Sequence, residues 1–275
     1  MVKIFTFFSF FLLFLPIFVD AQTQNRPLGA NYMAMGNVGV TKSDLWSVFH
    51  NQAGLSEIKN LSVGVNFENK YGIKELNYSA LALALPTKSG TFGLSYSYFG
   101  YPKYHENKLG LAYGKKLWEK VSAGIQLDYF NTKIYEQYGS GGLFTAEIGL
   151  QFEPVENFFI GAHAFNPLRI SYNTYDEEAL ASALKLGLAY LFSEKVLFAI
   201  EVESNFQQGT NFKSGIEFQP VDKFFLRAGI NTNPSTYHFG VGYQFQTLVA
   251  DLAFTHHQVL GYSTNISFRY IFKTR

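Results

Sequence analysis

The sequence contains no cysteine and carries almost no net charge. None of its 275 residues is cysteine, and the formal charge is +1 with only 16% charged side chains. An exported fold without cysteine cannot rely on disulfide bonds, and a near-neutral chain lacks the cationic surface that binds nucleic acid. Beyond residue 21 no run of eighteen apolar residues occurs, so the sequence predicts no transmembrane helix there.

The first residues have the pattern of a secretory signal peptide. Lys3 precedes the apolar run "IFTFFSFFLLFLPIFV", and Ala21 supplies a small residue at the expected cleavage site. An uncleaved membrane anchor is the alternative, but the run is short for a span and a polar stretch follows it. We therefore expect residues 1–21 to be removed and the mature chain to begin near Gln22.

Phenylalanine, tyrosine and glycine are abundant in what remains, and from residue 61 onward apolar and polar residues alternate. In 237–245, for example, every second residue is aromatic or valine and those between are His238, Gly240, Gly242 and Gln244. Such alternation predicts half-buried β-strands. Fourteen segments show it, with twelve strands as the alternative count: 61–68, 76–85, 92–98, 108–114, 121–130, 144–153, 158–165, 183–192, 196–203, 212–218, 224–231, 237–245, 248–255 and 262–272. In 76–85 the large residues change phase near Ala80, which indicates either a bulge or a strand covered on both faces.

The connections between these segments alternate between tight and longer. The tight set is 86–90, 116–120, 153–157, 192–195 and 219–223; the longer set is 101–107, 131–142, 165–180 and 205–211. Two hairpins nearly repeat each other, "QFEPVENFFIGA" (151–162) and "EFQPVDKFFLRA" (217–228), as expected for an up-and-down meander. The sequence therefore predicts an all-β, antiparallel barrel with short turns at one end and longer loops at the other.

Three features indicate that the barrel spans the outer membrane of a bacterium. The apolar phase is strongly aromatic near strand ends, the polar phase is rich in glycine, and the chain ends in the strand "SFRYIFKTR" with Phe272 near its terminus. A barrel of this kind turns its apolar phase to lipid and its polar phase to the lumen. Polar-phase glycines occur at 64, 93, 110, 124, 149, 187, 215, 229, 240 and 242.

The polar phase of the C-terminal half also places charges in the lumen. Together with His238 these are Glu201, Glu203, Lys213, Glu217, Arg227, Asp251 and Arg269. Charges of both signs in a low-dielectric interior are expected to pair, because an isolated buried charge is very costly. A structural ion-pair network is the preferred interpretation, and a polar path for a permeant is the alternative.

Residues 22–60 precede the first strand, and we expect them to form a plug inside the barrel, which comprises residues 61–275. We expect a helix capped by Ser43 or Asp44 that runs through Leu45 to Phe49 and closes at Gly54. A glycine-lined lumen lacks the side chains that would otherwise exclude such a segment. The sequence thus predicts an N-terminal helical hatch.

The block "AMGNVGVTKSDLWSVFHNQAGLSEI" (34–58) resembles the N-terminal motif of FadL-like outer-membrane proteins, including the PorV/PorQ proteins of type IX secretion. The matching residues are Met35, Gly36, Gly39, Val40, Asp44, Asn51, Ala53, Gly54 and Leu55, and "AFNPL" (164–168) is similar to a strand end in that group. The resemblance implies a fourteen-stranded barrel with an N-terminal hatch. Gln52 stands where the family has proline, and the loops are shorter than those of fatty-acid transporters. The resemblance therefore implies the fold and the hatch but not the substrate.

Catalysis has little support in the sequence, and we predict a protein that is not an enzyme and has no metal or cofactor. No Gly-x-Ser-x-Gly motif occurs, and His256 and His257 are adjacent on a strand, where they point to opposite faces. Two functions stay open. The preferred one is a PorV/PorQ-type barrel that binds secretion-system components or secreted cargo; the alternative is a FadL-like channel for small hydrophobic compounds that the hatch gates.

Overall fold

Strands dominate the computed structural model, which describes residues 26–134, 140–170, 180–207 and 209–273. The predicted signal peptide (1–21) and the expected mature start at Gln22 lie outside the described residues. Among the described residues no helix is long and apolar enough to cross a membrane.

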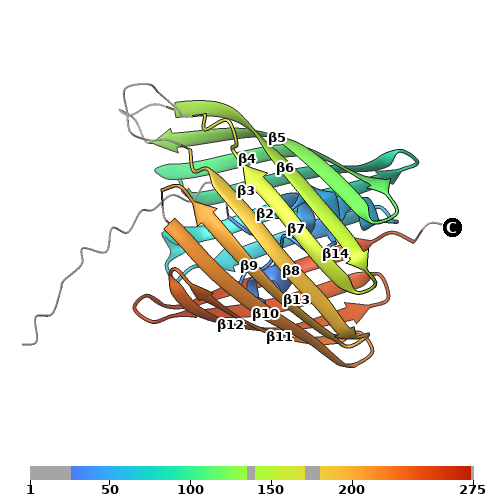
Figure 1. The fold of residues 1–275 in the computed structure, drawn as a ribbon. Coiled ribbons are helices and arrows are strands. Elements are labelled where there is room, and N and C mark those ends of the chain that lie inside the picture. Colours follow the sequence, from blue (N-terminus) through green and yellow to red (C-terminus); the bar gives the residue numbers. More distant parts are fainter. Residues whose placement is uncertain (1–25, 135–139, 171–179, 208, 274–275) are drawn as a thin grey trace, which may run out of the picture.

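Fourteen antiparallel strands form one closed barrel (Figure 1), which confirms the predicted class and the higher of the two strand counts. Each strand pairs with its sequence neighbours, and β1 closes the ring on β14, with Ser62 opposite Ile271 and Asn69 opposite Thr264. The strands are β1 (Ser62–Asn69), β2 (Asn77–Thr87), β3 (Gly90–Tyr101), β4 (Tyr104–Trp118), β5 (Val121–Ile134), β6 (Ser140–Val155), β7 (Phe158–Phe165), β8 (Ala183–Ser193), β9 (Val196–Asn205), β10 (Gly209–Val221), β11 (Phe224–Thr232), β12 (Ser235–Phe245), β13 (Leu248–His257) and β14 (Gly261–Ile271). Closure leaves no edge strand, as a membrane requires because lipid cannot satisfy free backbone groups.

The two faces of the wall differ in the way that the alternation predicts. On β5 and β6 the side chains of Leu127 and Phe144 are 65% and 71% exposed on the outside, whereas Gln126 and Glu147 are 1% and 0% exposed on the inside. An apolar outer surface around a polar interior is the arrangement of a barrel that spans a lipid bilayer. We therefore describe the two ends as the inner mouth, where β1 begins and β14 ends, and the outer mouth, where β1 turns into β2.

Some predicted details were wrong. Of the two alternatives for the phase change near Ala80, the bulge is absent, because β2 pairs with β1 and β3 in continuous register. The other alternative, a strand covered on both faces, holds for the inner face alone: Tyr78, Ala80, Ala82 and Ala84 face inward and are buried, while Leu81 and Leu85 face outward and are 40% and 46% exposed. The connections 101–107 and 205–211 are also shorter than predicted, since strand pairing continues through most of both segments.

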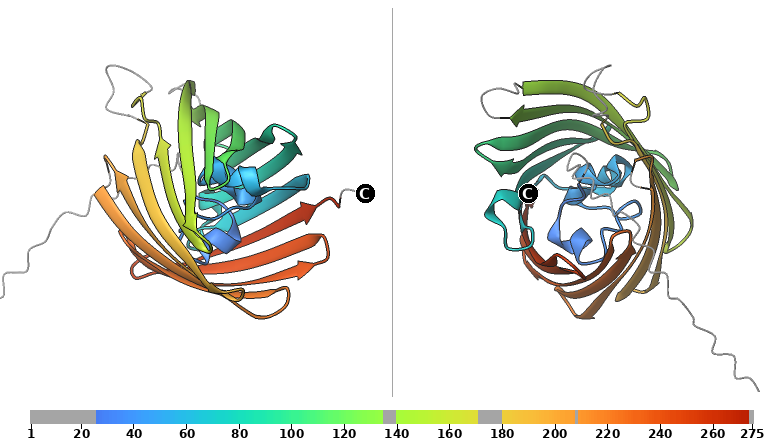
Figure 2. Two further views of the ribbon diagram at one scale, coloured as in Figure 1. Left: turned by 45° about the vertical axis from the view of Figure 1, so that its right-hand side comes forward. Right: turned by 90° about the vertical axis from the view of Figure 1, so that its left-hand side faces the viewer.

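The N-terminal segment lies inside the barrel (Figure 2). It contains α1 (Ala30–Met33), η1 (Leu45–Phe49) and η2 (Gln52–Glu57); a further short helix, η3 (Lys74–Leu76), lies between β1 and β2. The single helix predicted over 45–54 is thus two 3₁₀ turns, because Asn51 adopts an extended conformation and starts a second cap. We call residues 26–58 the lumenal plug; residues 22–25 of the predicted hatch lie outside the described residues.

Candidate functional site

The lumenal plug runs the length of the barrel from the outer to the inner mouth. At its start the guanidinium of Arg26 lies 5.4 Å from the ring centroids of both Tyr78 and Phe99, which belong to the outer ends of β2 and β3. At its end the chain enters β1, and the Leu61 carbonyl accepts a hydrogen bond from the Phe272 amide at the inner mouth. Any solute that crosses the barrel has to pass this segment.

Two polar side chains set the turns of the plug. Asp44 starts η1 by accepting from the Trp46 amide at 2.8 Å, and its own amide donates to Ser47 Oγ at 3.0 Å. Asn51 starts η2 by accepting from the Ala53 amide at 3.1 Å. Both arrangements satisfy the free amides of a helix start. Of the two predicted caps, the structure has Asp44, while Ser43 bonds Gln151 instead.

Inward glycines form a belt around the plug on ten of the fourteen strands. A Cβ atom added at any of them would come within 2.8 Å of a plug atom. The belt consists of Gly64, Gly93, Gly114, Gly124, Gly149, Gly161, Gly187, Gly215, Gly229 and Gly240. Of the predicted glycines, Gly110 and Gly242 instead face barrel side chains, and Gly114 and Gly161 were missed. The belt lets the wall approach the plug backbone at five of these glycines and plug side chains at the other five, so the plug fits this lumen closely.

The motif residues of the plug meet this belt. Asn51 lies against Gly149, and its amide nitrogen donates to the carbonyls of Val40 (2.6 Å) and Leu150 (3.0 Å). Gly54 packs on the Lys42 carbonyl and on Ser47, where a Cβ would come within 2.7 Å of either. The other predicted hatch residues, Met35, Gly36, Gly39, Asp44, Ala53 and Leu55, also lie in the plug, Met35 and Gly36 against Gly229 and Leu55 against Gly93. Their part in function stays a prediction.

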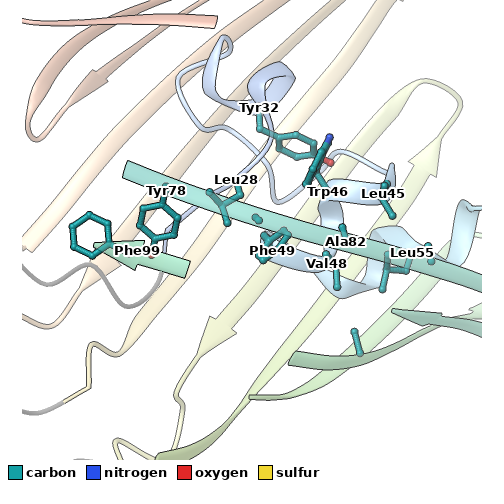
Figure 3. Close-up of a cluster of buried hydrophobic side chains, with 13 residues drawn as sticks. Leu28, Tyr32, Leu45, Trp46, Val48, Phe49, Leu55, Tyr78, Ala82 and Phe99 are labelled. Carbon is teal, nitrogen blue, oxygen red and sulfur yellow. The ribbon is translucent and has the colours of Figure 1, made fainter. Parts of the chain in front are cut away.

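Apolar side chains bind the plug to one side of the wall. Leu45, Trp46, Val48, Phe49 and Leu55 form a buried cluster with wall residues of β2, β3 and β4 (Figure 3). Full burial of one such side chain contributes about 1.5–3 kcal/mol. This side of the plug is therefore held by dense packing.

Ion pairs hold the plug at the inner mouth. Arg269 pairs with Asp44 of the plug at 2.7 Å and with Asp251 at 3.3 Å. Arg227 continues the chain to Asp251 at 2.7 Å and to Glu217 at 2.5 Å, and Glu217 pairs with Lys42 of the plug at 3.1 Å. Burial by itself raises the pKa of Asp44, but the charges of Arg269 and Lys42 outweigh it and hold that pKa below its ordinary value.

A second group holds the middle of the plug. Glu201 Oε2 accepts from the amides of Gly39 at 2.8 Å and Val40 at 2.9 Å, and Lys213 pairs with both Glu201 and Glu203. Nearby, burial lowers the pKa of His50 to about 3, so this imidazole is neutral where its Nε2 bonds the Leu28 carbonyl at 2.9 Å. All seven predicted lumen charges thus face the interior and belong to ion-pair networks. His238 faces inward as well and bonds Thr236 and Thr255.

A third group of charges was missed by the sequence reasoning. Lys108 pairs with Glu147 at 2.5 Å and Asp128 at 3.3 Å, Glu147 also pairs with His163 at 2.8 Å, and Gln52 of the plug donates to Glu147 at 2.7 Å. These residues lie in the same polar phase that identified the C-terminal charges, so the alternation could have found them. Gln52, the departure from the family's proline, uses its side chain for this contact.

Apolar side chains line the lumen at the outer mouth, directly above Lys108. The cluster comprises Phe130, Leu143, Phe165, Leu180 and Ala183, with Ile170 packed against it. Lys108 Nζ lies 5.4 Å and 5.3 Å from the ring centroids of Phe130 and Phe165. Asn166 donates to the carbonyls of Ile170 and Leu180 at 3.1 and 3.2 Å and so holds both ends of the β7–β8 connection over this cluster.

A cavity of about 560 Å³ opens below the plug at the inner mouth. Asn31, Lys42 and Asp44 of the plug line it together with the ion pairs of Arg227 and Arg269, and an apolar wall completes it: Phe152, Phe159, Ala189, Leu191, Leu197 and Phe225. The plug thus lies between the packed apolar cluster at the outer mouth and this mixed inner cavity.

Solved structures share this architecture. The Ralstonia pickettii toluene transporter TbuX matches with a TM-score of 0.71 and 10% identity over 91% of this chain and 100% of that one. The fold is FadL-like. The P. putida toluene transporter TodX matches with a TM-score of 0.69 and 12% identity over 91% and 100%, and a Pseudomonas aeruginosa FadL homologue with 0.64 and 11% over 90% and 98%.

Sequence comparison adds nothing to this result: no family model matches the chain, and no curated protein matches it. At 10–12% identity the likeness to TbuX, TodX and the FadL homologue shows the FadL-like fold alone. TbuX and TodX are toluene transporters. Nothing in the comparisons shows the PorV/PorQ branch of the predicted resemblance.

Proposed function

We propose that this protein is an outer-membrane channel for small hydrophobic compounds, gated by the lumenal plug. The observation that carries the proposal is the apolar cluster of Phe130, Leu143 and Phe165 inside the outer mouth. A pore for hydrophilic solutes would present polar side chains there, whereas apolar walls bind hydrophobic molecules out of water. The shared fold of two toluene transporters supports the same reading.

The inner cavity supplies a second apolar surface on the far side of the plug. Phe159, Leu197 and Phe225 line it opposite the ion pairs. A hydrophobic compound released past the plug would therefore meet apolar side chains again before it reaches the inner mouth. The plug is the barrier between the two surfaces, because it fills the lumen at the level of the glycine belt.

Uptake of toluene into cells that produce the protein tests this proposal. Phe165→Gln places an amide in the outer cluster, and we expect uptake to fall roughly tenfold, the factor that corresponds to about 1.4 kcal/mol of lost binding. Phe192→Gln is the matched control, because Phe192 is 64% exposed on the outside of the neighbouring strand β8. Equal uptake by the two variants would contradict the channel.

Removal of residues 22–58 tests the gate. The barrel closes through its own strand ladder, so we expect the shortened protein to fold and to show a large conductance in planar bilayers. An intact protein that conducts as well as the shortened one would show that the plug does not close the lumen.

A PorV/PorQ-type barrel that binds secretion-system proteins or cargo is the second candidate. The ion-paired, filled lumen favours it, since a closed barrel can still present its loops to a partner. Failure of toluene uptake together with co-purification of secretion components from cross-linked cells would replace the channel by this function.

A further inference from the structure

The plug is held differently on its two sides. Towards β2, β3 and β4 it packs through the apolar cluster of Leu45, Val48, Phe49 and Leu55. Towards β14 and β1, residues 26–31 of the plug have two neutral hydrogen bonds, from the Gly29 amide to Asn66 Oδ1 (3.1 Å) and from the Ala30 amide to Ser267 Oγ (3.2 Å). The charged contact of the plug with β14, between Asp44 and Arg269, lies outside this part of the plug. We call the boundary between residues 26–31 and these two strands the β14 seam.

Buried polar atoms without a partner collect along the β14 seam. Within the part of the chain that the structure describes, both polar atoms of the Asn265 side chain lack a hydrogen bond, as do Asn66 Nδ2, Asn31 Oδ1, Arg26 Nη1 and Arg269 Nε. Asn66 and Asn265 are completely buried. Buried polar groups are almost always hydrogen-bonded, so the closed seam is held at a cost in free energy.

The seam connects the two ends of the lumen. From Ser263 to Arg269 the inward positions of β14 are all polar, in the order Ser263, Asn265, Ser267 and Arg269 from the outer to the inner mouth. At the outer end Arg26 lies beside Tyr78 and Phe99, and at the inner end Asn31 and Arg269 line the 560 Å³ cavity. A shift of α1 into free space at the inner end would admit water to all of these groups.

We propose that the lumenal plug opens at the β14 seam and that the open seam passes small hydrophilic solutes. Water entering between α1 and β14 satisfies Asn265, Asn66 and Asn31, which offsets the loss of the two neutral hydrogen bonds. The apolar side of the plug stays packed, because water there would satisfy no polar group. The passage is a second activity, independent of hydrophobic uptake, and it uses the polar side of the lumen.

Entry of arabinose into proteoliposomes, followed by swelling, measures this passage. Asn265→Leu removes both unpartnered atoms and leaves the closed seam without that cost, so we expect swelling to slow roughly tenfold, equivalent to about 1.4 kcal/mol. We expect exchange of the Gly29 and Ala30 amides to slow as well. Asn265→Val, with a smaller side chain, serves where leucine overfills the site.

Two further variants separate the seam from a general effect on packing. Ser267→Ala removes the acceptor for the Ala30 amide and should speed both swelling and amide exchange. This effect is opposite to the one expected for Asn265→Leu. Asn166→Leu is the matched control, because Asn166 is equally buried but bonds Thr145, Ile170 and Leu180. It should slow neither swelling nor exchange at Gly29 and Ala30.

The proposal is overturned if the intact protein gives no swelling above protein-free liposomes, or if Asn265→Leu speeds amide exchange as Ser267→Ala does. Toluene uptake is measured on the same variants. The seam variants leave Phe130, Leu143 and Phe165 unchanged, so loss of the sugar passage with normal toluene uptake, or the reverse, distinguishes the two proposals.

Discussion

Replacement of a single belt glycine should release the plug while leaving the barrel intact. In Gly149→Ala the new Cβ would lie 1.9 Å from Asn51 Oδ1, far closer than atoms in contact, so Asn51 has to move. It would then lose its bonds to the Ala53 amide and to the carbonyls of Val40 and Leu150. At roughly 1 kcal/mol for each neutral hydrogen bond, the plug loses about 3 kcal/mol of stability.

Amide hydrogen exchange measures this loss directly. About 3 kcal/mol corresponds to roughly a hundredfold increase in the opening of η2, so we expect the Ala53 and Gly54 amides to exchange about a hundred times faster. Strand amides should keep their rates, because alanine is compatible with an extended backbone at this position. Gly142→Ala on the same strand is the control: Gly142 faces outward, where a Cβ meets only the end of the flexible Tyr129 side chain.

A double variant tests whether the contact with Asn51 is the cause. Asn51→Ala removes the atom that clashes, so adding Gly149→Ala to it should increase exchange little further. Unchanged exchange in Gly149→Ala, or an increase equal to that of Gly142→Ala, would refute the reasoning that the belt glycines exist to seat the plug.

Two further predictions concern the ion pairs. The partners of Asp44 hold its pKa below the ordinary 3.8, so its pairing with Arg269 stabilises the plug above that pH and is lost as the pH falls through the lowered pKa. Amide hydrogen exchange in η1 should therefore rise on acidification in the native protein but not in Asp44→Asn. Lys108→Met leaves Glu147 buried without this cation and should lower the free energy of unfolding of the barrel by about 3–5 kcal/mol. Lys116→Met at the exposed rim should lower it by less than about 1 kcal/mol. Urea unfolding in detergent measures both values, and equal losses would contradict burial as the cause.

The alternation of residues predicts the wall well because each inward or outward position is decided by one local contrast. The contrast of outward Leu127 with inward Gln126, or of outward Phe144 with inward Glu147, can be recognised from nearby residues in the sequence. Closure of the barrel then follows, because a membrane permits no free strand edge. Strand ends were less accurate, since pairing extends into the segments predicted as outer loops: β4 and β5 pair as far as Tyr104 and Ile134.

The contacts of the plug could be predicted only in part. The cap at Asp44 is local, so the sequence indicates it, but the distant partners of Asp44 and Asn51, Arg269 and Leu150, lie 225 and 99 residues away. The single helix expected over 45–54 failed for a related reason: tertiary bonds from Asn51 to the carbonyls of Val40 and Leu150 fix an extended residue inside it. The belt positions Gly114 and Gly161 were missed because a glycine within a strand indicates a close contact but does not identify the group that makes it.

The belt and the ion pairs solve different parts of one problem. Glycines bring the plug close to the wall on ten of the fourteen strands, but a glycine contact has no direction and does not fix the rotation of the plug about the barrel axis. Glu201 on the Gly39 and Val40 amides and Arg269 on Asp44 are directional, and each requires one orientation. A plug with the belt alone would close the lumen without a fixed position. Charge-neutralising variants such as Glu201→Gln should therefore leave the plug inside the barrel and loosen its orientation, seen as exchange broadening of plug resonances with little change in conductance.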